Sequence, residues 1–157
     1  MGNAEEAIVT GFGLEMGLRD FYLSMHKNVA TEATRALFAK LADIEIHHQE
    51  KLVQLYNDLT EMTISLLDFT KKIAEPAMEG GMTTDEYLQL YQADLNSELE
   101  VLGLAMSIEA QALDLYLRAA AKTESGGARR VLQQIADDER SHIAILSSYI
   151  DNQQDFI

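Results

Sequence analysis

The chain has 157 residues, of which 47% are hydrophobic, and these numbers suit one domain with one sizeable core. It contains no cysteine, which excludes disulfides, thiolate zinc sites, thiolate-ligated iron–sulfur clusters and cysteine nucleophiles. The formal net charge of −14 repels phosphate backbones, so we expect no nucleic-acid partner.

The first half of the chain predicts a helical hairpin over residues 4–59. One helix runs from about residue 4 to residue 26. A second follows Thr31, which is a plausible N-cap, and reaches about residue 59. Apolar residues recur along the second helix at spacings of three and four, which is typical of a helix with one buried face.

Residues 60–93 are expected to form a crossover between two hairpins. A structureless loop of this length is unusual in a compact domain, so we expect one or two short helices within it. The part at about 64–73 is amphipathic and must bury its apolar face on the bundle or on a partner, which makes a homodimer plausible. Thr83 and Glu86 fit a capping box that begins a second helical stretch.

The second hairpin is predicted over residues 94–152. One helix covers about 94–122, and another follows Ser125-Gly126-Gly127 and reaches about residue 151. The chain has a single proline and many Ala, Leu, Glu and Gln residues, which favours helices over strands. The predicted fold is therefore all-α, a single four-helix bundle domain (1–157) made of two antiparallel hairpins.

Targeting and membrane signals are not found in the sequence. The N-terminal residues lack a basic stretch followed by an apolar run, so we expect no secretory signal. No apolar run approaches the roughly 18 residues that a membrane-spanning helix needs. We therefore expect a soluble cytoplasmic protein with no membrane partner.

The two hairpins are copies of each other at an offset of 94 residues. The offset relates Glu15 to Glu109, Tyr22 to Tyr116, Glu45 to Glu139, and His48 to His142. An amphipathic repeat alone would recur in its leucines. Here the carboxylates and histidines recur, which indicates a shared polar site.

Six of the repeated residues are expected to meet in one buried layer: Glu15, Glu45, His48, Glu109, Glu139 and His142. In each hairpin the two glutamates lie 15 residues from the middle of the link, which is residue 30 in the first hairpin and residue 124 in the second. That separation is roughly 22 Å along a helix. Each histidine follows its glutamate by three residues and shares its face. Hairpins packed side by side in register would bring all six together.

The charge of this layer predicts metal ions. An unpaired buried carboxylate costs several kcal/mol or stays protonated. The nearest basic residues along the chain, Arg19 and Arg140, have no counterparts in the repeat. Two divalent cations would balance the four carboxylates. Carboxylates with one imidazole per ion suit iron or manganese, and zinc can also occupy such a site.

The pattern of Glu followed by Glu-x-x-His, present twice on four helices around a long crossover, resembles the ferritin-like di-iron carboxylate proteins. It is most similar to the di-iron domain of rubrerythrin. The resemblance implies two iron ions bridged by Glu45 and Glu139. It further implies that Glu15 and His48 complete one ion site, whereas Glu109 and His142 complete the other.

Two features depart from that family. Rubrerythrins have a further ligand glutamate three residues after the one at Glu109, and here that position is Ala112. They usually also carry a rubredoxin-type domain in which four cysteines hold an iron. The chain has no cysteine, so the resemblance implies an external electron donor.

The resemblance implies a di-iron oxidoreductase that reduces hydrogen peroxide or dioxygen. Tyr22 and Tyr116 match tyrosines of that family in position, and we expect them to hydrogen-bond a ligand carboxylate and to assist proton or electron delivery as catalytic residues. Two alternatives remain open: iron oxidation and storage in a closed shell, and a non-catalytic metal-binding or sensor module. His47 is expected to face solvent.

Overall fold

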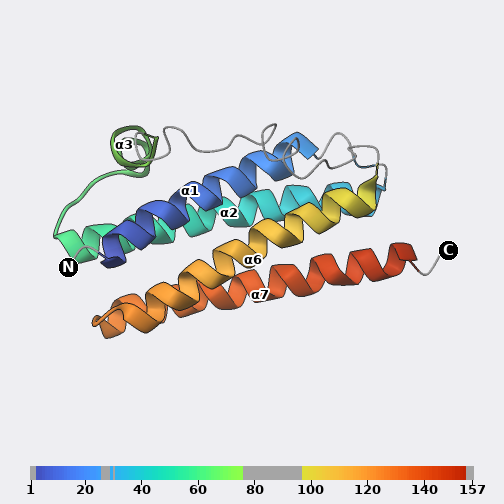
Figure 1. Ribbon diagram of the computed structural model, residues 1–157. Helices are drawn as coiled ribbons and strands as arrows, with labels where there is room; N and C mark the ends of the chain where they lie inside the picture. Colours follow the sequence, from blue (N-terminus) through green and yellow to red (C-terminus); the bar gives the residue numbers. More distant parts are fainter. Residues whose placement is uncertain (1–2, 26–28, 30, 76–96, 155–157) are drawn as a thin grey trace.

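The computed structural model describes residues 3–25, 29, 31–75 and 97–154, and every regular element in these ranges is a helix (Figure 1). The elements are α1 (Asn3–Met25), α2 (Glu32–Thr60), α3 (Leu66–Phe69), the π-helical turn η1 (Thr70–Ala74), α6 (Glu98–Lys122) and α7 (Gly126–Gln154). The prediction of an all-α fold is confirmed.

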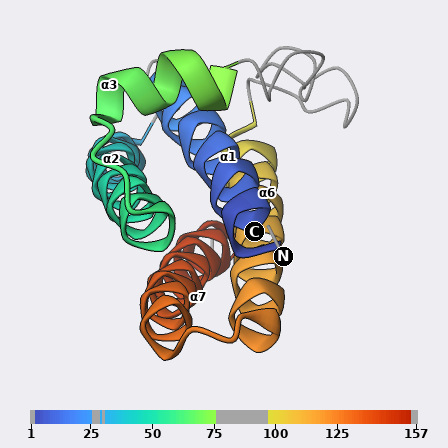
Figure 2. The same cartoon turned by 90° about the vertical axis from the view of Figure 1, so that its left-hand side faces the viewer.

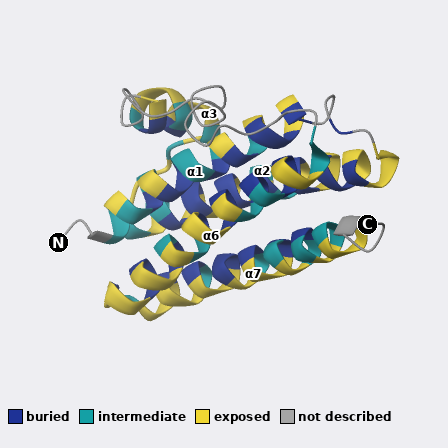
Figure 3. Ribbon diagram, turned by 45° about the vertical axis from the view of Figure 1, so that its right-hand side comes forward, coloured by how far each residue is buried: buried dark blue, intermediate teal, exposed yellow. Residues whose placement is uncertain are grey.

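The four long helices form two antiparallel hairpins that lie side by side (Figures 1 and 2). α1 pairs with α2, and α6 pairs with α7. The hairpins meet mainly through α1 and α6, with a smaller contact between α2 and α7. Buried residues lie on the inner faces of these helices (Figure 3). Among the described residues, no helix is long and apolar enough to cross a membrane.

The boundaries of the second hairpin differ in detail from the prediction. α6 begins at Glu98 because the Ser97 hydroxyl accepts a 3.3 Å hydrogen bond from the Glu100 N–H, and residues 94–96 lie outside the described part. α7 begins at Gly126 and so includes both glycines that were expected to precede it. The Ser125 hydroxyl accepts from the Ala128 N–H at 3.1 Å and caps this helix.

Thr31 precedes α2 as predicted, but its side chain does not cap the helix. The Thr31 hydroxyl donates instead to Glu98 Oε2 at 2.9 Å, and the Thr31 N–H donates to Glu98 Oε1 at 3.0 Å. The link of the first hairpin is therefore bonded to the first turn of α6, which helps to fix one hairpin against the other.

The segment formed by α3 and η1 crosses the first hairpin at a steep angle (Figure 2). Its Phe69 is fully buried, with its ring 4.8 Å from that of Phe12 and 5.1 Å from that of Tyr56 between centroids. Leu67 on the opposite face is 62% exposed. The apolar face of this crossover segment thus packs on the bundle, which the sequence had left open. The capping box expected at Thr83 lies outside the described residues.

Candidate metal centre

The structure brings all six residues of the buried layer together in the bundle. α1 and α6 each contribute one glutamate, and α2 and α7 each contribute Glu-x-x-His. The carboxylates are 0% exposed and the histidines are no more than 4% exposed. The side chains of the layer are thus almost completely shielded from bulk water.

The layer divides into two groups of possible metal ligands. The first consists of Glu15, Glu45, His48 and Glu139, and the second consists of Glu45, Glu109, Glu139 and His142. Within each group, one ligand atom from every residue lies within 4.8 Å of the others. Glu45 and Glu139 belong to both groups. They therefore stand where a carboxylate would bridge two ions.

Both histidines turn the Nδ1 atom into the layer. His48 Nδ1 lies 3.0 Å from Glu139 Oε1 and 3.3 Å from Glu15 Oε2. His142 Nδ1 lies 3.4 Å from Glu109 Oε1 and 3.5 Å from the nearer oxygen of Glu45. The two rings are nearly parallel, with centroids 5.8 Å apart and planes 20° apart. Each imidazole thus offers one nitrogen to the space between the carboxylates.

The polar atoms of the layer are poorly satisfied by the protein itself. Within the described part of the chain, both oxygens of Glu45 and of Glu139, Oε2 of Glu109 and Nδ1 of His142 make no hydrogen bond of good geometry. Buried polar atoms in native proteins nearly always have partners. Carboxylate oxygens and imidazole nitrogens are also the donor set that iron and manganese accept. The residues present therefore fit a pair of divalent cations.

Electrostatics give the same indication, because the four carboxylates crowd one another. Burial raises the pKa of Glu139 to about 11, and the neighbouring Glu109 and Glu15 add to the rise. Burial alone would lower the pKa of His48, but the adjacent carboxylates of Glu139 and Glu15 outweigh this and raise the pKa to about 11. Without cations, the layer therefore retains protons near neutral pH, and metal ions would have to displace them.

Two tyrosines donate hydrogen bonds to Glu15 and Glu109, and each tyrosine lies on the hairpin opposite its glutamate. Tyr22 on α1 donates to Glu109 Oε1 at 2.6 Å, and Tyr116 on α6 donates to Glu15 Oε1 at 2.7 Å. Burial, with the nearby carboxylates, raises the pKa of both phenols well above 10. The phenols therefore keep their protons and act as hydrogen-bond donors. Hydrogen bonds to a ligand carboxylate are what the family resemblance implied for these tyrosines.

Tyr116 fits into the bundle only because residue 11 is a glycine. A Cβ at Gly11 would lie 2.7 Å from the Tyr116 Cε1 atom and 3.0 Å from its hydroxyl oxygen. We expect Gly11→Ala to displace the ring and to destabilise the protein by about 1–3 kcal/mol, as overpacked cores do. The free energy of unfolding measured in urea tests this.

Gly17 on the same helix is the matched control for this substitution. A Cβ at Gly17 would meet nothing within 4 Å, and the residue is exposed. Gly17→Ala should stabilise the protein by roughly 0.5–1 kcal/mol, because alanine loses less backbone entropy in a helix. Equal effects of the two substitutions would contradict the role given to Gly11.

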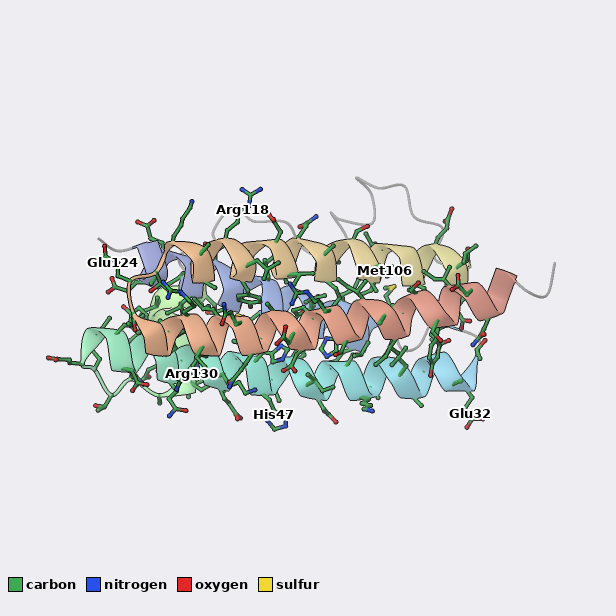
Figure 4. The ribbon with its side chains drawn as sticks, turned by 90° about the horizontal axis from the view of Figure 1, so that it is seen from below. Glu32, His47, Met106, Arg118, Glu124 and Arg130 are labelled. Carbon is green, nitrogen blue, oxygen red and sulfur yellow. The ribbon has the colours of Figure 1, made fainter. Side chains whose placement is uncertain are left out.

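Other polar residues considered from the sequence lie outside the layer. The His47 side chain is 67% exposed, points away from the bundle (Figure 4) and lies 3.6 Å from Glu50. Arg140 pairs with Asp137 at the surface. Ala112 is fully buried and offers no ligand atom.

One acidic residue lies just beside the layer. From the sequence, both a solvated position and a contact with a ligand histidine are open for Asp138. In the structure, Asp138 Oδ2 lies 3.0 Å from His48 Nε2.

Two helical hairpins around a buried carboxylate and histidine layer define a ferritin-like bundle with a potential metal site. The Rubrerythrin family matches residues 6–150, and the chain belongs to this family. It is also similar in fold to a solved structure, the hypothetical protein Pfu-1136390-001 from Pyrococcus furiosus, with a TM-score of 0.69. That match has 18% sequence identity and covers 98% of this chain and 91% of the other. No curated protein matches the sequence.

Proposed function

We propose that this protein binds two iron ions in the buried layer and uses them to reduce hydrogen peroxide or dioxygen. The observation that carries the proposal is the pair of ligand groups that share Glu45 and Glu139. Four carboxylates also match the charge of two divalent cations, and no basic side chain is needed. Membership of the rubrerythrin family supports the same reading.

In this proposal, Glu15 and His48 complete one ion site, and Glu109 and His142 complete the other. Ferrous ions held by these residues would supply the electrons for reduction of peroxide or dioxygen. The protein fixes the geometry of the ligands and excludes water from a layer whose side chains are almost entirely buried. Zinc or manganese can occupy the same ligands.

The two tyrosines have a double role in the proposal. Their hydrogen bonds orient the carboxylates of Glu15 and Glu109, and a ligand oriented in this way loses less entropy when it binds metal. Each phenol also holds a proton next to a carboxylate at the edge of the layer. Reduction of peroxide to water consumes protons, so a proton stored there serves the reaction. The electrons come from an external donor.

Anaerobic loading with ferrous iron followed by hydrogen peroxide tests the function. We expect two iron ions per chain and the rapid appearance of near-ultraviolet absorption from ferric iron after peroxide is added. The matched variant Glu139→Gln keeps the shape of the side chain and should show neither. Binding of two ions without any spectral change would overturn the redox role and leave a metal-binding module.

The size of the assembly separates this proposal from iron storage. Storage requires a large closed shell, whereas a peroxide or oxygen reductase needs none. Light scattering of the iron-loaded protein is expected to show a small species. A shell-sized particle that accumulates many iron ions per chain would favour storage instead.

A further inference from the structure

The two histidines of the layer differ in what lies behind them. His48 Nε2, the nitrogen that faces away from the layer, lies 3.0 Å from Asp138 Oδ2. The same carboxylate oxygen lies 3.9 Å from Lys51 Nζ. The side chains of Asp138 and Lys51 are both 46% exposed, so the outer edge of His48 borders a polar and partly solvated surface.

Two pairs of contacts within the layer follow the twofold repeat closely. The His48–Glu15 distance of 3.3 Å has its counterpart in the His142–Glu109 distance of 3.4 Å. The crossed tyrosine bonds of 2.6 and 2.7 Å are a second such pair. The contacts with Glu45 and Glu139 follow the repeat less closely, because His48 Nδ1 lies 3.0 Å from Glu139 Oε1 whereas His142 Nδ1 lies 3.5 Å from Glu45 Oε1.

The twofold repeat does not extend to the residues on the outer side of the His48 imidazole ring. At the offset of 94 residues, Asp138 corresponds to Ile44, and Lys51 corresponds to Ile145. Both isoleucines are partly buried and pack against the core. An isoleucine side chain has no hydrogen-bond acceptor. Ile44 therefore cannot bond to the imidazole of His142 as Asp138 bonds to that of His48.

This difference bears on metal binding. An imidazole that binds metal through Nδ1 keeps its proton on Nε2, and a carboxylate that accepts this proton fixes the tautomer and makes the ligating nitrogen more basic. Loss of such a partner typically weakens metal binding about 10- to 100-fold. The half-exposed position of Asp138 favours the lower end of that range, because water screens its charge.

We propose that Asp138 is a positioning residue that makes the two ion positions unequal, so that the position at His48 fills first and binds more tightly. The proposal rests on the metal site proposed above. It concerns only the order and affinity of binding.

Calorimetric titration of the chelator-treated protein with Co²⁺ tests the proposal. We expect two binding steps that differ in affinity by about 10-fold or more. Asp138→Asn keeps the shape of the side chain and removes its charge, and it should weaken the tighter step until the two steps merge. Asp137→Asn is the matched control, because the neighbouring Asp137 pairs with Arg140 at the surface, and it should change neither step.

The outcomes separate this inference from the proposed function. If the wild-type protein binds no Co²⁺, the metal site itself fails. If it binds two ions in equal steps, or if Asp138→Asn leaves the tighter step unchanged, the metal site stands and the role of Asp138 is overturned.

A measurement on the wild-type protein identifies which position fills first. With ¹⁵N-labelled histidine, the imidazole signals of His48 and His142 can be followed by NMR while diamagnetic Zn²⁺ is added. We expect the first equivalent to shift the Nδ1 signal of His48 and to retain the proton on its Nε2. A first equivalent that shifts His142 would contradict the proposal.

Discussion

Raising the pH from about 6.5 to about 8.5 is expected to lower the melting temperature of the metal-free protein by roughly 5–10 °C. The pKa of His48 rises from 6.5 to about 11 on folding, and that of Glu139 rises from 4.5 to about 11. A raised pKa stabilises the folded state below the unfolded value, and this stability is lost as the pH climbs toward the folded value. His48 and Glu139 are 3.0 Å apart, so we count one proton shared by the pair. Over about two pH units this proton is worth roughly 3 kcal/mol, or roughly 5–10 °C in a chain of this size.

Metal ions should reverse this pH dependence. Zn²⁺ binds the deprotonated ligands, so its apparent affinity, and with it the melting temperature, should rise over the same pH range. Differential scanning calorimetry with and without Zn²⁺ measures both trends. Glu139→Gln serves as the control: its neutral amide has no proton to lose, so the metal-free trend should weaken to the part that His48 and Glu15 contribute. If the metal-free protein became more stable toward pH 8.5, this would contradict the conclusion that the layer retains protons without metal.

Glu45→Gln is expected to abolish the binding of both metal ions. Glu45 belongs to both ligand groups, and neither of its oxygens makes a hydrogen bond within the described part of the protein. An amide cannot bridge two cations as a carboxylate does, and the layer also loses one negative charge. Metal analysis by mass spectrometry after loading and gel filtration should give a fall from two ions per chain to none.

Two variants control for nonspecific effects of removing a carboxylate. Glu15 belongs to one ligand group only, so Glu15→Gln should lower the metal content from two ions to one. Glu50 lies on the same helix as Glu45 but is 57% exposed and near His47, so Glu50→Gln should leave two ions bound. If Glu45→Gln and Glu15→Gln each removed a single ion, Glu45 would not bridge.

Much of the site could be predicted by counting residues from each inter-helix link in the sequence. Glu15 and Glu45 are equally far from one link, and Glu109 and Glu139 are equally far from the other. Because α-helices rise by a constant amount per residue, equal counts imply equal heights, and the structure places the four carboxylates together. The helix bounds were predicted within a few residues for the same reason, since apolar periodicity marks a buried face.

The features that escaped prediction depend on contacts between distant segments. The apolar face of residues 64–73 required a cover, but periodicity alone does not tell whether that cover is the bundle or another chain. Phe69 meets Phe12 only because the crossover turns back over the first hairpin. Thr31 likewise resembled an ordinary helix cap, and its bond to Glu98 joins residues 67 positions apart.

The near-complete burial of the layer has a kinetic consequence. Each ligand group combines residues of both hairpins, so a bound ion would tie the hairpins together, and we expect its release to require their separation. We expect a chelator to remove metal at a rate that does not depend on the chelator concentration, because local opening of the bundle sets the pace. The residence time of the ion would then report how often the two hairpins part.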